Sequence, residues 1–188
     1  SFNSAICKTL RKSTNIKTIQ YVCPKFWAWR YGRAYGFNDI YDKVFSIFPF
    51  ESKLLEKHKV NFSYVGHPLA NKLPTKINDN ELKKELKISQ NKKIIAILPG
   101  SRKSEIKHHE KPLIDFINKY KLEDPNLEII LALNKESDLS EGFKKNEKKF
   151  KIIFNKTQKV IAACDLAIVA SGTATLETAI LAKPMVVI

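Results

Sequence analysis

Two short stretches of the chain place small, hydroxyl and arginine residues directly after apolar runs, where they could bind a phosphate group. In one, the apolar residues 166–170 are followed by Ser171-Gly172-Thr173-Ala174 and then by a helix-forming run. The first N–H groups of a helix lack partners within the helix, and the helix dipole makes that end positive. Gly172 lets a ligand approach the backbone, and Ser171 and Thr173 add hydroxyls. The turn suits a phosphate or diphosphate, although an ordinary helix N-cap would use the same residues.

The other stretch ends an apolar run at 94–98 with Pro99-Gly100-Ser101-Arg102. Arg102 is one of only four arginines, and the other 29 of the 33 basic residues are lysines. If this position needed only positive charge, lysine would be the expected residue in so lysine-rich a chain. An arginine here therefore favours planar, bidentate recognition of an anion. A surface arginine in an ordinary turn is the alternative. Two such turns in one sheet would together favour a nucleoside diphosphate as the ligand.

Glu177 lies near the first turn of the helix that follows Ser171-Gly172-Thr173. Its carboxylate would interact favourably with the helix dipole without any ligand. A carboxylate beside a phosphate site can also accept hydrogen bonds from ribose hydroxyls, as acidic residues do in dinucleotide-binding folds. The residue alone does not decide between these two interpretations.

Aromatic and arginine residues gather in a third place. Trp27, Trp29, Arg30 and Arg33 lie within seven residues of one another. They could form a stacking, phosphate-binding wall of a cleft, or anchor an irregular loop in the core. His67, between Gly66 and Pro68, is interpreted as a hinge or cleft residue.

These residues must be positioned by alternating strands and helices. The sequence predicts strands at 16–22, 42–48, 61–66, 94–100, 127–133, 151–154, 166–170 and 184–188. It predicts helices at 3–12, 50–59, 81–88, 106–123, 157–165 and 175–183, with a charged helix or loop at 140–150. Apolar strands that alternate with helices indicate an α/β fold with parallel sheets covered on both faces. Ligands of such sheets bind outside the carboxyl ends of the strands, where both turns lie.

The composition limits the class of protein. The net charge of +14 invites a nucleic-acid or anionic-membrane partner, but the lysine excess is spread along the chain and is also typical of coding bias. No apolar stretch approaches the ~18 residues of a membrane span. The three cysteines, Cys7, Cys23 and Cys164, have no metal-site spacing, and their odd number favours reduced thiols in a cytosolic protein.

Five motifs in a fixed order resemble one family of enzymes. They are YVCPKFWAWRYGR (21–33), SIFPFE (46–51), VGHPLA (65–70), LPGSRKSEI (98–106) and VASGTATLE (169–177), the last followed by KPMVV (183–187). Together they strongly resemble the lipid-A-disaccharide synthase family, inverting glycosyltransferases of bacterial outer-membrane biogenesis. The resemblance runs over nearly the whole chain, and the WAWR and LPGSR pieces distinguish this family best from other glycosyltransferases.

The resemblance implies a GT-B architecture, in which two Rossmann-like domains face one another across a cleft, and both would be incomplete here. Residues 1–72 would be the end of the N-terminal, acceptor-side domain, 73–80 a linker, and 81–188 the first part of the C-terminal domain that binds the UDP-sugar donor. We expect this piece alone to be inactive. The family's presumed catalytic acid would precede Phe2, so the general base is expected upstream of Ser1.

The resemblance also implies the chemistry, for which we expect no metal and no cofactor. UDP-2,3-diacylglucosamine would transfer its sugar to the 6-hydroxyl of 2,3-diacylglucosamine 1-phosphate, giving a β-1,6 disaccharide 1-phosphate and UDP. The donor would contact the two turns and Glu177, with Arg102 stabilising the leaving diphosphate, and the 27–33 cluster and His67 would lie on the acceptor side. The expected location is the cytoplasmic face of the inner membrane, bound peripherally, with a homo-oligomer possible.

Two alternatives stay open. One is another GT-B enzyme that uses a UDP-sugar, of the peptidoglycan glycosyltransferase or UDP-N-acetylglucosamine 2-epimerase type. The other is a basic nucleic-acid-binding module, although no nucleic-acid motif is evident.

Overall fold

The fold was analysed in a computed structural model that describes residues 2–73 and 79–188. The chain divides into two compact units, Ser1–Lys72 and Leu73–Ile188. The linker predicted at 73–80 falls largely on residues 74–78, which lie outside the described residues, as does Ser1; within the predicted linker, Leu73 is buried and a helix begins at Asp79. None of the described helices is both long and apolar enough to cross a membrane.

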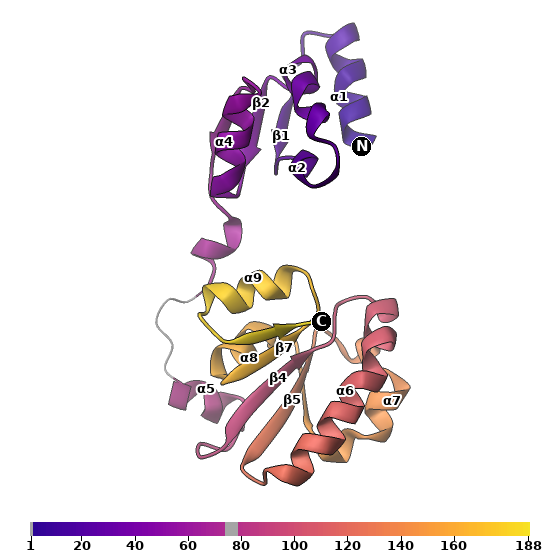
Figure 1. Cartoon of the computed structure of the whole chain (residues 1–188), viewed down its shortest axis with the longest axis vertical. Helices are drawn as coiled ribbons and strands as arrows, with labels where there is room; N and C mark the ends of the chain where they lie inside the picture. Colours follow the sequence, from indigo (N-terminus) through magenta and orange to yellow (C-terminus); the bar gives the residue numbers. More distant parts are fainter. Residues whose placement is uncertain (1, 74–78) are drawn as a thin grey trace. The chain divides into compact units, whose positions relative to one another are not determined.

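The first unit is a three-stranded parallel sheet in the order β1-β2-β3 (Figure 1). Its strands are β1 (Ile19–Tyr21), β2 (Lys43–Ser46) and β3 (Phe62–Tyr64). Its α-helices are α1 (Phe2–Ser13), α2 (Phe26–Trp29), α3 (Phe37–Ile40) and α4 (Pro49–Lys57), with 3-10 turns at Tyr31–Gly36 and Pro68–Asn71. The core consists mainly of aromatic and aliphatic residues, including Phe26, Phe37 and Leu55 from the helices and Tyr41 directly after α3. The WAWR segment thus forms a short helix followed by a 3-10 turn, rather than a loop.

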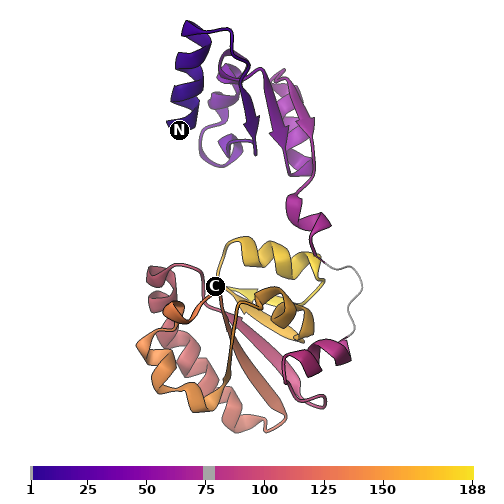
Figure 2. The same ribbon diagram turned by 180° about the vertical axis from the view of Figure 1, so that it is seen from behind.

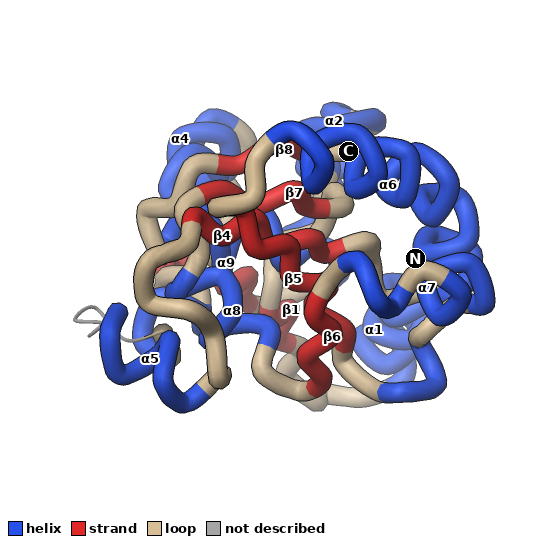
Figure 3. Tube along the Cα trace, turned by 90° about the horizontal axis from the view of Figure 1, so that it is seen from below, coloured by secondary structure: helices blue, strands red, loops and turns tan. Residues whose placement is uncertain are grey.

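The second unit is a five-stranded parallel sheet in the order β6-β5-β4-β7-β8, seen as one row in Figure 3. Its strands are β4 (Lys93–Leu98), β5 (Leu127–Leu133), β6 (Lys151–Phe154), β7 (Leu166–Val169) and β8 (Met185–Val187). Its helices are α5 (Asp79–Glu85), α6 (Lys103–Glu123), α7 (Glu141–Lys145), α8 (Thr157–Ala163) and α9 (Thr173–Ile180), with 3-10 turns at Glu136–Asp138 and Glu147–Lys149. The charged segment predicted at 140–150 is therefore split into two short pieces.

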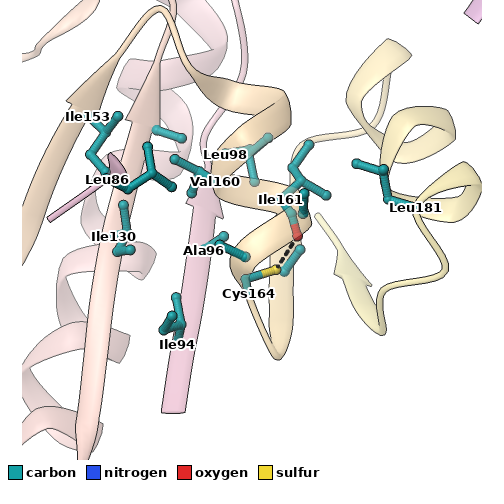
Figure 4. Packing of buried hydrophobic residues seen from close by; sticks show 14 of the residues in the cluster. Leu86, Ile94, Ala96, Leu98, Ile130, Ile153, Val160, Ile161, Cys164 and Leu181 are labelled. Atoms are coloured by element: carbon teal, nitrogen blue, oxygen red, sulfur yellow. Dashed lines mark hydrogen bonds between the residues drawn. The ribbon is translucent and has the colours of Figure 1, made fainter. Parts of the chain in front are cut away.

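The central strands of this sheet are buried on both faces, as their continuous apolar sequence predicts. In β4, Ile94, Ala96 and Leu98 pack with α5 and α8, whereas Ile97 packs with α6 on the opposite face. Figure 4 shows the first of these clusters, in which the Cys164 thiol donates to the Ile161 carbonyl at 3.1 Å. Helices α5, α8 and α9 cover one face and α6 and α7 the other (Figures 1 and 2). The prediction of an α/β chain with parallel sheets is confirmed.

The strand order places a topological switch point between β4 and β7. From β4 the chain moves outward through β5 to β6, then returns to pair β7 with the other side of β4 and continues to β8. The loops that leave two such neighbouring strands diverge toward opposite faces, which opens a crevice at their carboxyl ends. The two turns singled out in the sequence are those that follow β4 and β7.

Candidate functional site

A cleft of about 870 Å³ lies at the carboxyl ends of the strands in the second unit. Strand-end loops and the first turns of α6, α8 and α9 form its walls. The lining residues are Leu98, Gly100, Ser101, Glu105, Ala132, Asn134, Asn155, Lys156, Thr157, Gln158, Lys159, Ala170, Ser171, Gly172, Thr173, Ala174 and Glu177. Seven of the eight residues predicted to bind the donor therefore line one cleft, and only Arg102 is missing from its walls.

Helix α9 presents its N-terminus to this cleft. Gly172 is the N-cap, and α9 begins at Thr173 rather than at residue 175 as predicted. The Ser171 N–H donates to the Ile188 carbonyl at 3.0 Å, which fixes the turn. The Thr175 hydroxyl and N–H both bond to the Gly172 carbonyl, at 2.6 and 3.3 Å. Thr173 and Ala174, the first two residues of the helix, line the cleft, and both the unpaired N–H groups typical of a helix start and the helix dipole favour an anion there.

The structure requires glycine at only one of the two glycine positions of the site. Gly100 has φ of +124°, and a Cβ there would lie 2.9 Å from both Cβ and Oε2 of Glu105, so the fold itself requires glycine. Gly172 has an extended φ of 164°, and a Cβ there would meet nothing within 4 Å. Neither packing nor backbone strain explains Gly172. The space beside it is open to a ligand.

The Gly100–Arg102 loop is organised around Glu105, which the sequence analysis did not single out. The Glu105 carboxylate accepts the N–H groups of Ser101 and Arg102 at 3.2 and 3.3 Å, and pairs with the Arg102 guanidinium at 2.5 Å. The hydrogen bond from the Arg102 guanidinium is the largest cause that lowers the pKa of Glu105, and the hydrogen bonds from the two backbone N–H groups lower it further. The Arg102 side chain is 78% exposed. Also unforeseen, His109 Nδ1 lies 2.8 Å from the Pro99 carbonyl and secures the same loop.

Glu177 has a side-chain partner from another helix. Gln158, near the start of α8, donates from Nε2 to Glu177 Oε1 at 2.8 Å. This contact directs one carboxylate oxygen toward α8 and leaves Oε2 as an acceptor for a ligand hydroxyl. Asn155, at the end of β6, adopts a left-handed φ of 56°, a conformation that asparagine tolerates better than most residues.

Two lysines near the start of α8 line the cleft, and both are paired with Glu85 of α5. Lys159 Nζ contacts both oxygens of Glu85 at 2.6 and 2.8 Å, and Lys156 Nζ contacts Oε1 at 3.3 Å. The hydrogen bonds from Lys159 and Lys156 lower the pKa of Glu85. Both lysines and Gln158 follow the end of β6, so the strand-end rule that identified the other two turns would have identified them too.

The candidate residues of the first unit are only partly drawn together. Trp27 Nε1 donates to the buried Glu51 carboxylate at 3.3 Å, and the Trp27 ring packs edge-on against Phe50 at 5.0 Å. His67 Nδ1 accepts the Leu69 N–H at 3.2 Å, as the cap of a 3-10 turn. Arg30 and Arg33 are exposed, and the Trp29 side chain lies outside the described part of the chain. Trp27 is thus anchored to its own unit, and the assignment of these residues to a cleft stays a prediction.

The described residues also bear on metal binding, and they define the surroundings of two of the three cysteines. No group of three or more His, Cys, Asp or Glu side chains there could hold a metal ion. Cys23 and Cys164 are buried, and burial raises their pKa values to about 12 and about 11. Both thiols therefore stay protonated and unreactive near neutral pH.

Comparison with known proteins identifies the family. A family model described as lipid-A-disaccharide synthetase matches residues 1–188. Lipid-A-disaccharide synthase 1 of Legionella pneumophila (strain Philadelphia 1) is 36% identical over 192 residues, which cover 100% of this chain and 50% of that protein. Lipid-A-disaccharide synthase of Coxiella burnetii (strain Dugway) is 37% identical over 189 residues, again covering 100% and 50%. The chain spans about half the length of these relatives.

A solved structure of a glycosyl transferase family 9 protein from Veillonella parvula is 12% identical and overlaps with a TM-score of 0.49, covering 98% of this chain and 60% of that one. The family assignment rests instead on the sequence matches, which include every residue of the chain. The chain belongs to the lipid-A-disaccharide synthetase family.

Proposed function

We propose that the protein containing this chain is a lipid-A-disaccharide synthase, and that the second unit binds its sugar-nucleotide donor. The reaction would transfer 2,3-diacylglucosamine from UDP to the 6-hydroxyl of 2,3-diacylglucosamine 1-phosphate, with inversion, giving the β-1,6 disaccharide 1-phosphate and UDP. The observation that carries the proposal is the N-terminus of α9, which opens into the switch-point cleft with an unobstructed glycine at its cap.

The departure of UDP from the donor sugar explains why an anion-binding site would be useful here. As the bond from the anomeric carbon to the diphosphate breaks, negative charge builds on the departing UDP. Preorganised N–H groups and the dipole at the start of α9 would stabilise that charge, and they need no reorganisation during the reaction. Arg102 would leave Glu105 and add a bidentate contact, because its exposed side chain is free to turn. Glu177, held by Gln158, would accept a hydrogen bond from a ribose hydroxyl.

The acceptor half of the reaction is assigned to the first unit. Trp27, Trp29, Arg30, Arg33 and His67 are the proposed contacts on that side. A general base must remove the proton of the attacking 6-hydroxyl, and we place it before Ser1.

Both substrates carry acyl chains, so we propose that the protein works peripherally at the cytoplasmic face of the inner membrane, with the lysine-rich surface attracting anionic lipid. Salt-sensitive sedimentation with anionic vesicles would support this placement, and salt-insensitive binding would contradict it. Self-association into a homo-oligomer remains part of the proposal, to be measured by analytical ultracentrifugation.

The donor site can be tested on the complete protein that contains this chain by calorimetric titration with UDP, uridine and inorganic phosphate. We expect UDP to bind at least about tenfold more tightly than either, a difference of about 1.4 kcal/mol, because only UDP reaches both the α9 N-terminus and Glu177. Equal affinity for UDP and phosphate would contradict the proposal. Steeply salt-dependent binding of DNA or RNA without UDP binding would instead favour a nucleic-acid module.

A further inference from the structure

The donors of the Gly100–Arg102 loop already hold an anion in this structure, and that anion belongs to the chain itself. Two backbone N–H groups and one guanidinium converge on the Glu105 carboxylate. These are the groups that the sequence motif would offer to a diphosphate. Glu105 also lines the cleft, with its side chain 31% exposed, so the carboxylate lies at the cleft wall and not in the core.

The loop is shaped to admit this carboxylate. A Cβ at position 100 would lie 2.9 Å from Glu105 Oε2, so the glycine at this position makes room for the Glu105 side chain. Glutamate at the third position of a helix often accepts the N–H of the N-cap residue, and that accounts for the contact with Arg102 N–H. It does not account for the additional contacts with Ser101 N–H and with the Arg102 guanidinium.

We propose that Glu105 is a positioning residue that acts as an internal competitor: it holds Arg102 and the loop N–H groups until the diphosphate of the donor takes Arg102 from it. This inference rests on the proposed function, because it needs a diphosphate in the cleft. An anion that shares donors with Glu105 is also repelled by its charge. Glu105 therefore weakens the binding of UDP, which favours release of that product.

The direction of the change in UDP affinity distinguishes this competition from a purely structural role of Glu105. Loss of a merely structural contact would leave UDP affinity unchanged or lower it, whereas loss of a competing charge raises it. Glu105→Gln is the suitable change, because the amide oxygen can still accept the N-cap N–H while the charge is removed. Glu128→Gln is the matched control: Glu128 also accepts one backbone N–H, from Ser89 at 3.3 Å, but it lies at the start of β5, away from the cleft.

The experiment is a UDP titration of the complete protein that contains this chain, as wild type, Glu105→Gln, Glu128→Gln, Arg102→Ala and Glu105→Gln combined with Arg102→Ala. We expect Glu105→Gln to bind UDP about two- to fivefold more tightly, the size of an exposed charge interaction, with a smaller gain at high salt. Glu128→Gln should match the wild type, and the gain should be smaller without Arg102, because only the competition for the loop N–H groups and the charge repulsion would then be relieved. Unchanged or weaker binding by Glu105→Gln overturns the inference while leaving the proposed function intact. No UDP binding by the folded wild type overturns both.

Discussion

Replacement of Gly172 by aspartate is expected to abolish UDP binding while leaving the protein at least as stable as before. The backbone at Gly172 is extended, and a side chain there would meet nothing within 4 Å. Aspartate is among the best N-cap residues and favours the positive end of α9, so the stability should rise by a few tenths of a kcal/mol. The same carboxylate would occupy the diphosphate position, and like charges at contact distance should weaken binding by about a hundredfold or more.

Gly172→Asn is the matched control, because asparagine caps a helix about as well and has nearly the same size without the charge. We expect it to reduce affinity for UDP far less than Gly172→Asp, while affinity for uridine changes little in either variant. Thermal unfolding reports the stability, and calorimetric titration reports the affinity. Undiminished UDP binding by Gly172→Asp would show that the diphosphate is not held at the start of α9.

Arg102→Ala is expected to reduce product formation by about 10²- to 10³-fold, the usual cost of removing one donor that stabilises charge in a transition state. Stability should change by less than about 1 kcal/mol, because the ion pair with Glu105 is exposed. Arg102→Lys should recover only part of the activity, since a lysine supplies charge without the planar pair of donors. The assay measures turnover in the complete protein that contains this chain, with unfolding curves for each variant.

An unchanged rate in Arg102→Ala would remove Arg102 from the donor site and leave the family assignment as it is. A large loss that accompanies unfolding would instead assign the residue a structural role. A loss of turnover with a normal unfolding curve is the result that supports charge stabilisation by this side chain.

The sequence predicted the parts of the site that follow from local pattern. Apolar runs interrupted by glycine and hydroxyl residues marked the ends of β4 and β7, and the parallel-sheet rule placed both ends at one edge. Ser171, Gly172 and Glu177 accordingly line one cleft. The identity of the first unit as acceptor side and of the second as donor side stays a prediction.

What the sequence did not predict depends on contacts between separate elements. Gln158 meets Glu177 only because α8 and α9 lie side by side, and no spacing in the chain encodes that contact. Trp27 is bonded to Glu51, which stands on a different helix. The composition of the chain predicts an anion ligand at Arg102 but not that Glu105 already pairs with it, although a residue three positions on is within reach in any helix that begins there.

The most direct test of the central claim is the reaction itself. The complete protein that contains this chain would be incubated with UDP-2,3-diacylglucosamine and 2,3-diacylglucosamine 1-phosphate, and the products identified by mass spectrometry. We expect the disaccharide 1-phosphate together with UDP. A folded protein that binds UDP but does not form this product would instead be an enzyme that acts on a different UDP-sugar.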